Sequence, residues 1–533
     1  MLKNIKLAFD YHRVKDILLL ASVFVTGAAV LIIEIVAMRI LSPYYGNTIY
    51  TTSSVIGTVL AALSLGYYIG GRLSDKYPRY HFFYGIIFIS GLSIFFLRFL
   101  YNTILPYFSL LFSITIGSLI FSILIFFLPS FLMGTLSPFA IKLYKKDQGQ
   151  ERIGSQSGEV FFWSTLGSIA GSLLSGFVFI PYFGIDVIVA TTGIILSIWG
   201  LCGFLLCRPK NLDNKNTGET QWNQNQKILT VVILFFLFEV LFLWFTIPQK
   251  QSEVLYEKDG IYEKVKITEG IWNARPARFL FQDKSHSAAM YLDSDELLYH
   301  YTKYYELYKL INPKATKAFL IGGGAYSIPK ALLKDSPNMQ VDVSEIEPEL
   351  FSLAQKYFNL QENVRLANYT EDGRRFLSRN QKKYDIIVSD VYYSFFSVPI
   401  HLTTKEFFEL AKSRLGPEGV FIGNFAGELK AQPPSFIFSE IKTFKNIFPN
   451  SYFFAVNSAE SKNSQNIIFL GINGLKQIDF KSKAILNSND LITQDLEQKN
   501  INISNFDLLK HKELTDDFSP IEYLVSRVVN KRY

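Results

Sequence analysis

Three consecutive glycines follow a short apolar segment, and an acidic residue stands at a fixed distance behind them. The run is Gly322, Gly323 and Gly324. It comes directly after Lys317–Ile321, which is expected to be a buried strand. Glycines in that position let the backbone approach a ligand and present amide N–H groups to it. Glu345 stands 21 residues after Gly324, at the end of a second expected strand, Gln340–Ile346. An acid there can accept hydrogen bonds from both hydroxyls of a ribose, so this spacing predicts a nucleoside site.

Two further acids end the next apolar segments. Asp372, with Gly373 beside it, follows an expected third strand, Val364–Ala367, where a carboxylate and an amide can face an adenine edge. Asp390 ends an expected fourth strand, Tyr384–Asp390. Open α/β sheets bind ligands at the carboxyl ends of their strands, which makes Asp390 a candidate site residue. The alternative is that Asp390 only caps a helix or a turn.

The elements that must position these residues alternate between strand and helix. From Lys317 onward the order is strand, glycine loop, helix, strand and helix, which predicts a doubly wound, Rossmann-like α/β sheet over residues 311–533. Alternating polarity in Gly260–Thr268 and Arg278–Gln282 predicts a small antiparallel β-sheet before it. Residues 248–310 are therefore expected to form a small β subdomain and a linking helix.

Residues 1–247 have a different composition, with long apolar runs that predict a multi-pass α-helical membrane domain. A helix needs about 20 apolar residues to cross the hydrocarbon of a bilayer. Seven runs meet that length, which predicts a transmembrane domain of about seven helices. They are Ile17–Ile40, Thr52–Gly71, Phe82–Leu100, Thr115–Ile141, Val160–Ile180, Ile185–Cys207 and Ile228–Ile247.

Lysine and arginine gather in alternate loops of this half. Basic residues precede the first run and follow the second, fourth and sixth, so the N-terminus and these loops are expected in the cytoplasm. Seven crossings would then leave the C-terminal half outside, where a nucleoside cofactor is not expected. We resolve this conflict toward a plasma-membrane protein whose C-terminal half faces the cytoplasm, with Ile228–Ile247 as the doubtful crossing.

Composition excludes some other classes. The formal net charge is +7, which the membrane-flanking lysines and arginines explain, so no nucleic-acid partner is expected. The two cysteines, Cys202 and Cys207, lie in one apolar run and offer neither a disulfide framework nor zinc spacing. No metal is expected.

Taken together, the glycine run, Val343–Pro348, Asp372-Gly373 and Tyr384–Asp390 resemble spermidine synthase, a polyamine aminopropyltransferase. The resemblance spans roughly residues 255–424, and the whole chain is similar to a membrane-fused spermidine synthase-like protein. It implies transfer of an aminopropyl group from decarboxylated S-adenosylmethionine to putrescine or a related amine or polyamine, with release of methylthioadenosine. A homodimer is left open, and the lipid bilayer is the other expected partner.

The resemblance also implies a role for each matching residue. Asp390 would be the catalytic base, Glu345 would hold the ribose, and Asp372 with Gly373 would hold the adenine. The remaining implied residues are Gly322, Gly323, Gly324, Glu263 and Pro399 on the cofactor side, and Tyr305 and Tyr393 on the substrate side.

The chain departs from the family pattern where the family binds amines. Ala325 stands where the family has Asp after the glycines, and Tyr393 stands where it has a second acid. Tyr305 replaces a His in a Tyr-His-Glu run, and Glu263 replaces a Gln. Burying two ammonium groups without those carboxylates would cost several kcal/mol, so a bulkier or less charged acceptor is expected.

The N-terminal half has a resemblance of its own. The loop Gly70–Arg79 is similar to the cytoplasmic loop between helices two and three of major facilitator transporters. The resemblance covers six of the predicted spans, which would make half of that twelve-helix fold.

Two alternative functions stay open. The missing acid at Ala325 motivates an S-adenosylmethionine-dependent methyltransferase acting on a membrane-proximal acceptor. The helical half motivates a non-enzymatic transporter or sensor that binds an adenosyl ligand or a polyamine. Fold resemblance alone does not choose among them.

Overall fold

The computed structural model describes residues 2–144, 153–207, 230, 234, 253–391, 399–482, 485 and 491–529. The chain divides into two compact units, Met1–Lys250 and Gln251–Arg532. Each unit is described here by itself. The first is helical and apolar, and the second combines helices with two β-sheets.

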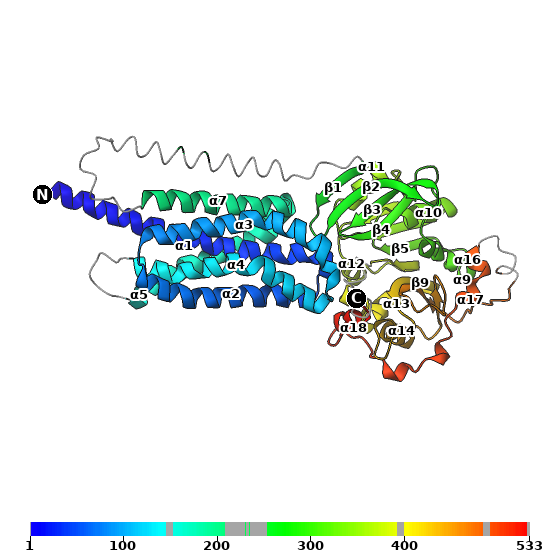
Figure 1. Cartoon of the computed structure of the whole chain (residues 1–533). Helices are drawn as coiled ribbons and strands as arrows, with labels where there is room; N and C mark the ends of the chain where they lie inside the picture. The colour runs from blue at the N-terminus through cyan, green and yellow to red at the C-terminus, as the bar shows by residue number, and fades with distance from the viewer. Residues whose placement is uncertain are drawn as a thin grey trace. The chain divides into compact units, whose positions relative to one another are not determined.

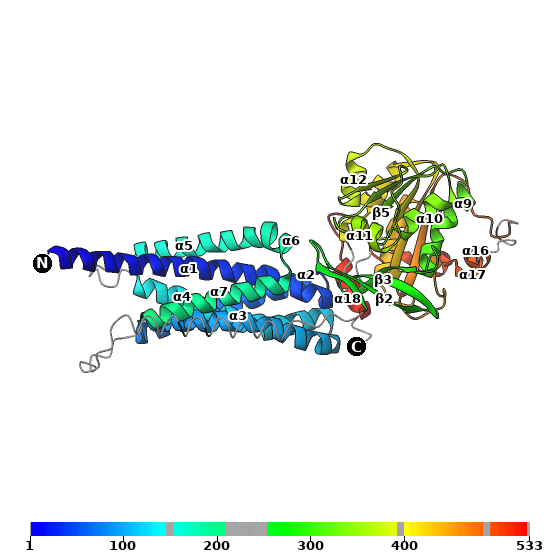
Figure 2. The same ribbon diagram turned by 90° about the horizontal axis from the view of Figure 1, so that it is seen from above.

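Six helices of the N-terminal unit are long and apolar enough to cross a membrane, among the residues that the structure describes. Figures 1 and 2 show them side by side as a bundle. They are α1 (Leu2–Tyr45), α2 (Ile49–Lys76), α3 (Tyr80–Phe108), α4 (Ile114–Leu143), α5 (Ile153–Leu174, continued by a π-helical turn at Ser175–Phe179 and by α6, Ile180–Tyr182) and α7 (Ile185–Leu206). This confirms the predicted multi-pass helical fold class. The seventh predicted span, Ile228–Ile247, lies outside the described residues except Thr230 and Leu234.

Small residues set the close approach of these helices. A Cβ atom added to Gly167 or Gly171 of α5 would lie 2.0 Å from the carbonyl oxygen of Phe24 or 2.3 Å from that of Ala28, on α1. Such glycines allow backbones in a membrane to pack against each other, where lipid gives little hydrophobic drive for association.

The C-terminal unit begins with a four-stranded antiparallel sheet in the order β1-β2-β3-β4. Its strands are β1 (Val254–Asp259), β2 (Lys264–Trp272), β3 (Arg275–Gln282) and β4 (Ser285–Tyr291). Alternation buries Val265, Ile267 and Leu280 on the face that packs against Leu350 and Leu353. This is the small sheet that the alternating sequence predicts.

A seven-stranded mixed sheet follows, in the order β10-β11-β9-β8-β5-β6-β7. The strands from β9 to β7 pair in parallel, while β11 pairs antiparallel with both β9 and β10. They are β5 (Lys317–Ile321), β6 (Gln340–Ser344), β7 (Leu366–Tyr369), β8 (Tyr384–Ser389), β9 (Leu415–Gly427), β10 (Ser451–Ala455) and β11 (Gln465–Asn473). This sheet confirms the predicted Rossmann-like class.

Both faces of the sheet are covered, because successive side chains of the central strands point to opposite sides. Leu320 packs with Leu332 and Val343 on one face, and its neighbour Phe319 packs with Phe376 on the other. The helical segments are η4 (His300–Leu307), α9 (Tyr308–Ile311), α10 (Ser327–Asp335), α11 (Leu350–Tyr357), α12 (Gly373–Arg379), η5 (Ile400–Leu402), α13 (Lys405–Ser413), α14 (Phe436–Ile447), α16 (Leu491–Gln494), α17 (Leu496–Lys499), η6 (Ile503–Asn505), η7 (Leu508–Lys510) and α18 (Ile521–Val529).

Two strands begin later than predicted. β2 begins at Lys264 and not at Gly260, because residues 260–263 form the turn after β1, which the Gly260 amide closes by donating to the Glu263 carbonyl at 2.8 Å. The third parallel strand is Leu366–Tyr369, two residues later than the predicted Val364–Ala367. Val364 is fully exposed in a turn that precedes the strand. Asn363 closes this turn by accepting a hydrogen bond from the Arg365 amide at 3.0 Å. An Asx turn of this kind can replace the first residues of an apolar run that would otherwise extend as a strand.

Candidate active site

The glycine loop lies between β5 and α10 and passes directly over the end of β8. Gly322 has φ +90°, and a Cβ atom added to it would lie 2.5 Å from the carbonyl oxygen of Asp390. The Asp390 amide in turn donates to the carbonyl of Ile321 at 3.1 Å. Only glycine tolerates both this φ and this approach, so the loop fixes Asp390 relative to the predicted nucleoside site.

Glu345, directly after β6, holds the glycine loop from the other side. Its Oε2 accepts hydrogen bonds from the amides of Gly323 at 2.8 Å and Gly324 at 3.2 Å, and its Oε1 accepts from the Glu347 amide at 2.8 Å. Burial raises the pKa of Glu345, and these amide donors offset only part of that rise. A ribose would therefore bind to the remaining lone pairs of a carboxylate that already faces the loop.

The two residues that follow the glycines are structural. Ala325 is buried in the core beneath the small sheet, against Val265 and Leu280. Tyr326 is fully buried with φ +57°, and its hydroxyl donates to Asn368. The residue that replaces the family's acid is therefore turned into the core, where no ammonium group could meet it.

Glu347 joins the small sheet to the end of β6. Its carboxylate accepts from the amides of Tyr262 at 3.0 Å and Ile261 at 3.4 Å, in the turn between β1 and β2. Glu263 follows in the same turn and is buried, with 6% of its surface exposed. The structure thus brings Glu263, Glu345 and Glu347 to one end of β6, and their predicted cofactor contacts stay predictions.

Asp372 is the N-cap residue of α12 and Gly373 is the first residue of that helix, and their predicted adenine contacts stay predictions. Asp372 caps the helix, since its Oδ1 accepts from the Arg375 amide at 2.8 Å, and its Oδ2 lies 2.8 Å from Nε2 of His401. Burial raises the pKa of Asp372, but the hydrogen bonds from His401 and from the Arg375 amide outweigh it and lower this pKa overall. Gly373 is buried, with no room for a Cβ against Ile321.

Asp390 follows the last residue of β8, next to the glycine loop. Its Oδ1 accepts a hydrogen bond from Nδ2 of Asn424 at 3.0 Å, and Asn466 donates to Oδ1 of Asn424 at 2.9 Å. The Tyr301 hydroxyl also bonds to Asp390. Burial raises the pKa of Asp390, and the hydrogen bonds from Asn424 and Tyr301 counteract part of this rise. A partly buried carboxylate with a raised pKa suits a group that takes up a proton.

Sequence reasoning missed Tyr301 and selected Tyr305, one helical turn later. The Tyr305 hydroxyl donates to Oδ2 of Asp335 at 2.6 Å, at the end of α10, and does not bond to Asp390. Tyr301 is therefore the tyrosine of this pair that lies beside Asp390, and the predicted substrate contact of Tyr305 stays a prediction. The sequence signal for Tyr301 was a run of closely spaced tyrosines. The sequence alone could not tell which tyrosine lies beside Asp390, because that depends on the orientation of η4.

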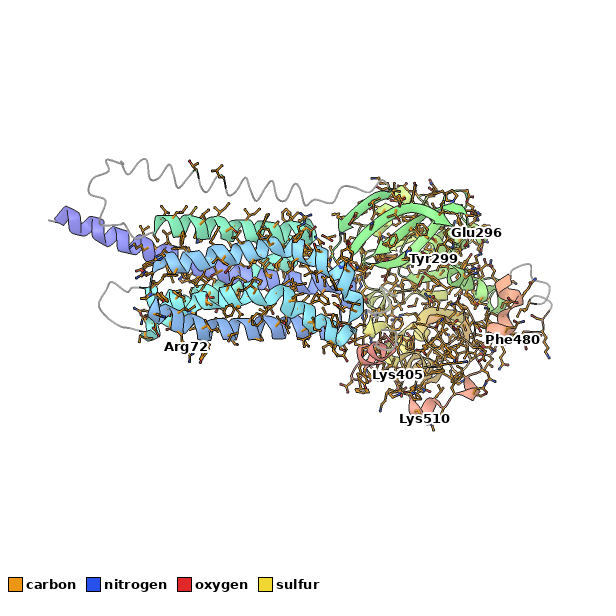
Figure 3. The ribbon with its side chains drawn as sticks, in the orientation of Figure 1. Arg72, Glu296, Tyr299, Lys405, Phe480 and Lys510 are labelled. Atoms are coloured by element: carbon orange, nitrogen blue, oxygen red, sulfur yellow. The ribbon has the colours of Figure 1, made fainter. Side chains whose placement is uncertain are left out.

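Tyr301 continues into an aromatic row. Its ring stacks on Tyr299 with centroids 6.0 Å apart, and Tyr299 meets the edge of Trp272 at 5.9 Å. Trp272 is 38% exposed, so the row runs from the protein surface to Asp390. Figure 3 marks Tyr299 among the side chains of this unit. The Tyr299 hydroxyl is buried and finds no hydrogen-bond partner among the described residues.

Two predicted residues lie around the segment between β8 and η5. Pro399 directly precedes η5 and is described, with φ −69° and ψ 98°. Tyr393 lies outside the described residues, so its predicted substrate contact stays a prediction. In the described part of the chain, no group of three or more His, Cys, Asp or Glu side chains could hold a metal ion.

Comparisons with known proteins find relatives of the C-terminal unit. Residues 297–481 match the family model of the spermine/spermidine synthase domain. A polyamine aminopropyltransferase of Vibrio vulnificus is 26% identical over 309 residues, which covers 55% of this chain and 98% of the relative.

A second relative also takes in part of the helical unit. Polyamine aminopropyltransferase 2 of Aquifex aeolicus is 22% identical over 425 residues, 75% of this chain and 77% of the relative. A match of that coverage must extend beyond Gln251–Arg532. Among solved structures, a probable spermidine synthase of Corynebacterium glutamicum is 18% identical with a TM-score of 0.38, covering 46% of this chain and 89% of that one.

Proposed function

We propose that this chain, whose C-terminal unit contains a spermidine synthase domain, is a membrane-anchored aminopropyltransferase. The donor is decarboxylated S-adenosylmethionine, and the acceptor is a primary amine. The observation that carries the proposal is the Asp390 carboxylate, held by Asn424 and Tyr301 beside the glycine loop and Glu345.

The chemistry follows from that juxtaposition. The acceptor nitrogen attacks the aminopropyl methylene carbon that is bound to the donor's sulfonium. A C–N bond forms there, and the bond between that carbon and sulfur breaks. The bonding pair returns to sulfur, so neutral methylthioadenosine leaves. The amine is nucleophilic only when neutral, and its proton passes to Asp390. The raised pKa of Asp390 brings the proton affinity of this carboxylate closer to that of the amine.

We assign the donor to the edge formed by the glycine loop, Glu345 and Asp372. Glu345 takes the ribose, Asp372 and Gly373 take the adenine, and Glu263 and Pro399 complete the cofactor side. The acceptor side is the aromatic row Trp272, Tyr299 and Tyr301, with Tyr393 as the other predicted contact. Aromatic rings in place of carboxylates support an acceptor that is less charged than a polyamine.

The proposal is tested by comparing the affinities of decarboxylated and ordinary S-adenosylmethionine for the purified protein by calorimetry. The ordinary donor carries an extra carboxylate, which would enter a site that already holds Glu345 and Asp390. We expect it to bind more weakly. Tighter binding of the ordinary donor would instead support the methyltransferase alternative, which the buried Ala325 motivates.

Removing the Tyr301 hydroxyl should shift the pH dependence of the reaction. Tyr301→Phe deletes a hydrogen bond that stabilises ionised Asp390, so the pKa of Asp390 rises further. Since the base must be ionised, the acidic limb of kcat/KM moves to higher pH, by about one unit. Tyr305→Phe is the matched control, because its hydroxyl bonds to Asp335. Equal profiles for both variants would refute the role of Tyr301.

The membrane side of the catalytic unit gives a further prediction. The six spans among the described residues, with no crossing at Ile228–Ile247, would return the chain from a cytoplasmic N-terminus to the cytoplasm, where the donor is expected. In a variant with Cys202 and Cys207 replaced, a cysteine at Ser461 should react with a membrane-impermeant maleimide only after the cells are opened. A cysteine at Leu111, which is exposed between α3 and α4, is the external control and should react in intact cells. Labelling of both positions in intact cells would place the unit outside.

A further inference from the structure

We propose that His401 is a positioning residue, which acts through Asp372 to set the selectivity of the donor site for adenine. The C-terminal segment 511–516 holds His401 in place through a contact between Asp516 and Arg374. This inference rests on the proposed function, since it concerns the adenine end of the donor.

The Asp372 carboxylate is fixed at both oxygens. The Arg375 amide donates to Oδ1 at 2.8 Å, and Nε2 of His401 lies 2.8 Å from Oδ2. The first contact belongs to the helix that Asp372 caps, whereas the second comes from η5, 29 residues later. A carboxylate held at both ends cannot rotate, so its free lone pairs keep one direction.

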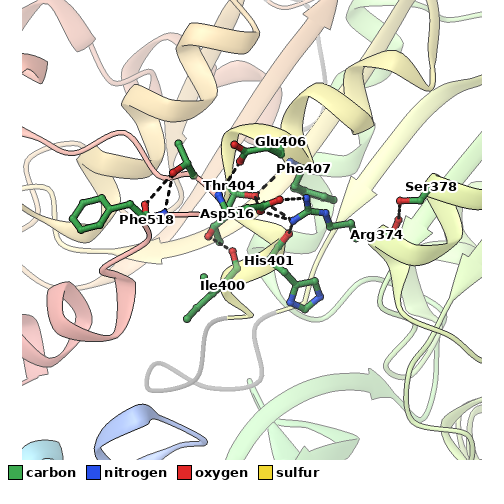
Figure 4. A network of polar contacts seen from close by, with 11 residues as sticks. Arg374, Ser378, Ile400, His401, Thr404, Glu406, Phe407, Asp516 and Phe518 are labelled. Atoms are coloured by element: carbon green, nitrogen blue, oxygen red, sulfur yellow. Dashed lines mark hydrogen bonds and ion pairs between the residues drawn. The ribbon is translucent and has the colours of Figure 1, made fainter.

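Arg374 connects His401 to the C-terminal segment (Figure 4). Its Nη1 donates to the carbonyl of His401 at 2.9 Å and to Oδ1 of Asp516 at 2.7 Å, while its Nη2 donates to Oδ2 of Asp516. The planar guanidinium thus binds Asp516 at both oxygens and holds the η5 backbone at the same time. Thr404 donates to Oδ1 of Asp516 at 2.7 Å, and the Asp516 amide donates to Glu406 at 2.9 Å.

Asp516 is itself well anchored, although its side chain is partly exposed. Two residues earlier, the Leu514 amide donates to Thr443 on α14 at 2.9 Å, and the Leu514 carbonyl accepts from the Lys405 amide at 2.8 Å. Leu514 is fully buried and His511 is nearly so. Nδ1 of His511 accepts a hydrogen bond from the Ser435 amide at 3.1 Å. The segment 511–516 therefore gives Arg374 a fixed partner.

A purely structural reading is that this network only fastens the C-terminal segment to the unit. Exposed ion pairs add little to stability, and the side chains of Arg374 and Asp516 are 21% and 44% exposed. That reading explains the Arg374–Asp516 pair. It gives no reason for the same guanidinium to hold the carbonyl of the residue whose ring meets Asp372.

Adenine selectivity follows from the direction of the carboxylate. The 6-amino group of adenine donates a hydrogen bond, which Asp372 can accept. The 6-oxo group of hypoxanthine presents lone pairs and is repelled by a fixed carboxylate. If Asp372 is free to rotate, it accepts the amino group less well and turns away from the oxo group. Discrimination between the two bases then falls.

The experiment measures binding of methylthioadenosine and methylthioinosine to the full-length purified protein by calorimetry. We expect the wild-type protein to prefer the adenine compound, and His401→Ala to reduce that preference about tenfold, the value of one hydrogen bond to a charged group. Asp516→Asn should reduce it in the same direction by a smaller factor. His401→Gln, which keeps a donor for Asp372, should recover part of it.

Asp507→Asn is the matched control, because it removes a nearby carboxylate whose contacts among the described residues, an ion pair with Lys510 and a hydrogen bond from the Leu509 amide, stay within η7. It should leave the preference unchanged. His401 is half-exposed, so its variants are expected to fold, and thermal unfolding verifies this. Equal loss of both affinities in His401→Ala and Asp516→Asn, or no loss, would overturn the inference. Failure of the wild-type protein to bind either nucleoside would instead contradict the proposed function.

Discussion

Replacing Asp390 with asparagine is expected to lower kcat by about 10³-fold, within the range for removal of a general base. Asparagine has nearly the same shape and can still accept the hydrogen bond that Asn424 donates at 3.0 Å, so the local structure is kept. What is lost is the only group of this side chain that can take a proton from the acceptor amine. Initial rates at saturating donor measure the effect, and the KM of the donor should change little.

The matched control is Asp385→Asn on the same strand. Asp385 lies at the other end of β8, where its carboxylate accepts from the amides of Thr316 at 2.8 Å and Lys317 at 3.0 Å. This variant should keep wild-type kcat while losing some stability. An Asp390→Asn enzyme with a rate within a few-fold of wild type would remove Asp390 from the mechanism.

Glu345→Gln should mainly affect donor binding and folding stability. The Glu345 carboxylate accepts three hydrogen bonds from backbone amides, those of Gly323, Gly324 and Glu347. A glutamine offers one oxygen, and its NH₂ group would face an N–H donor on the other side. We expect the free energy of unfolding to fall by about 1–3 kcal/mol, which is the cost of a buried polar group left unmatched. Donor affinity should fall by about 100-fold, because both the ribose contact and the glycine loop are disturbed.

Calorimetric titration of the donor and denaturant unfolding of the same variant separate the two effects. Glu349→Gln serves as the control, since Glu349 binds Tyr256 and Lys258 at the surface of the small sheet. Wild-type donor affinity in Glu345→Gln would show that the strand-end acid does not hold the ribose.

The parts of this site that follow one another along the chain could be predicted from the sequence. The glycine loop, Glu345 and Asp390 each stand at the end of a strand, and parallel strands bring their carboxyl ends to one edge. Alternation and apolar runs locate those strands to within a residue or two. Spacing along the chain was therefore sufficient to bring the glycine loop, Glu345 and Asp390 to one edge of the sheet.

The supporting residues could not be found in this way. Asn424 and Asn466 meet only because β9 and β11 pair antiparallel in a register that sets Asn424 opposite Ile468. A shift of one residue would point either side chain to the other face. Asp516 reaches Arg374 across 142 positions through a segment with no regular pattern. The choice of Tyr301 over Tyr305 depends on how η4 is oriented on the sheet.

In the helical unit, too, some features could be predicted from the sequence and others could not. Run length and hydropathy located the six described spans, but not how the helices pair. Gly66 and Gly70 of α2, for example, meet the backbone of α4 at Phe131 and Thr135, where a Cβ would lie 2.5 and 2.6 Å away. A glycine in an apolar run is compatible with packing on any neighbour, so the partner helix had to come from the structure.

The most direct test of the central claim is the identity of the nucleoside that the purified protein releases. The protein is incubated with a primary amine and either decarboxylated or ordinary S-adenosylmethionine, and the products are separated by chromatography. We predict methylthioadenosine from the decarboxylated donor, in amounts equal to the aminopropylated amine, and its release about 10³-fold more slowly from Asp390→Asn. S-adenosylhomocysteine from the ordinary donor, with no methylthioadenosine from the other, would contradict the proposed aminopropyl transfer.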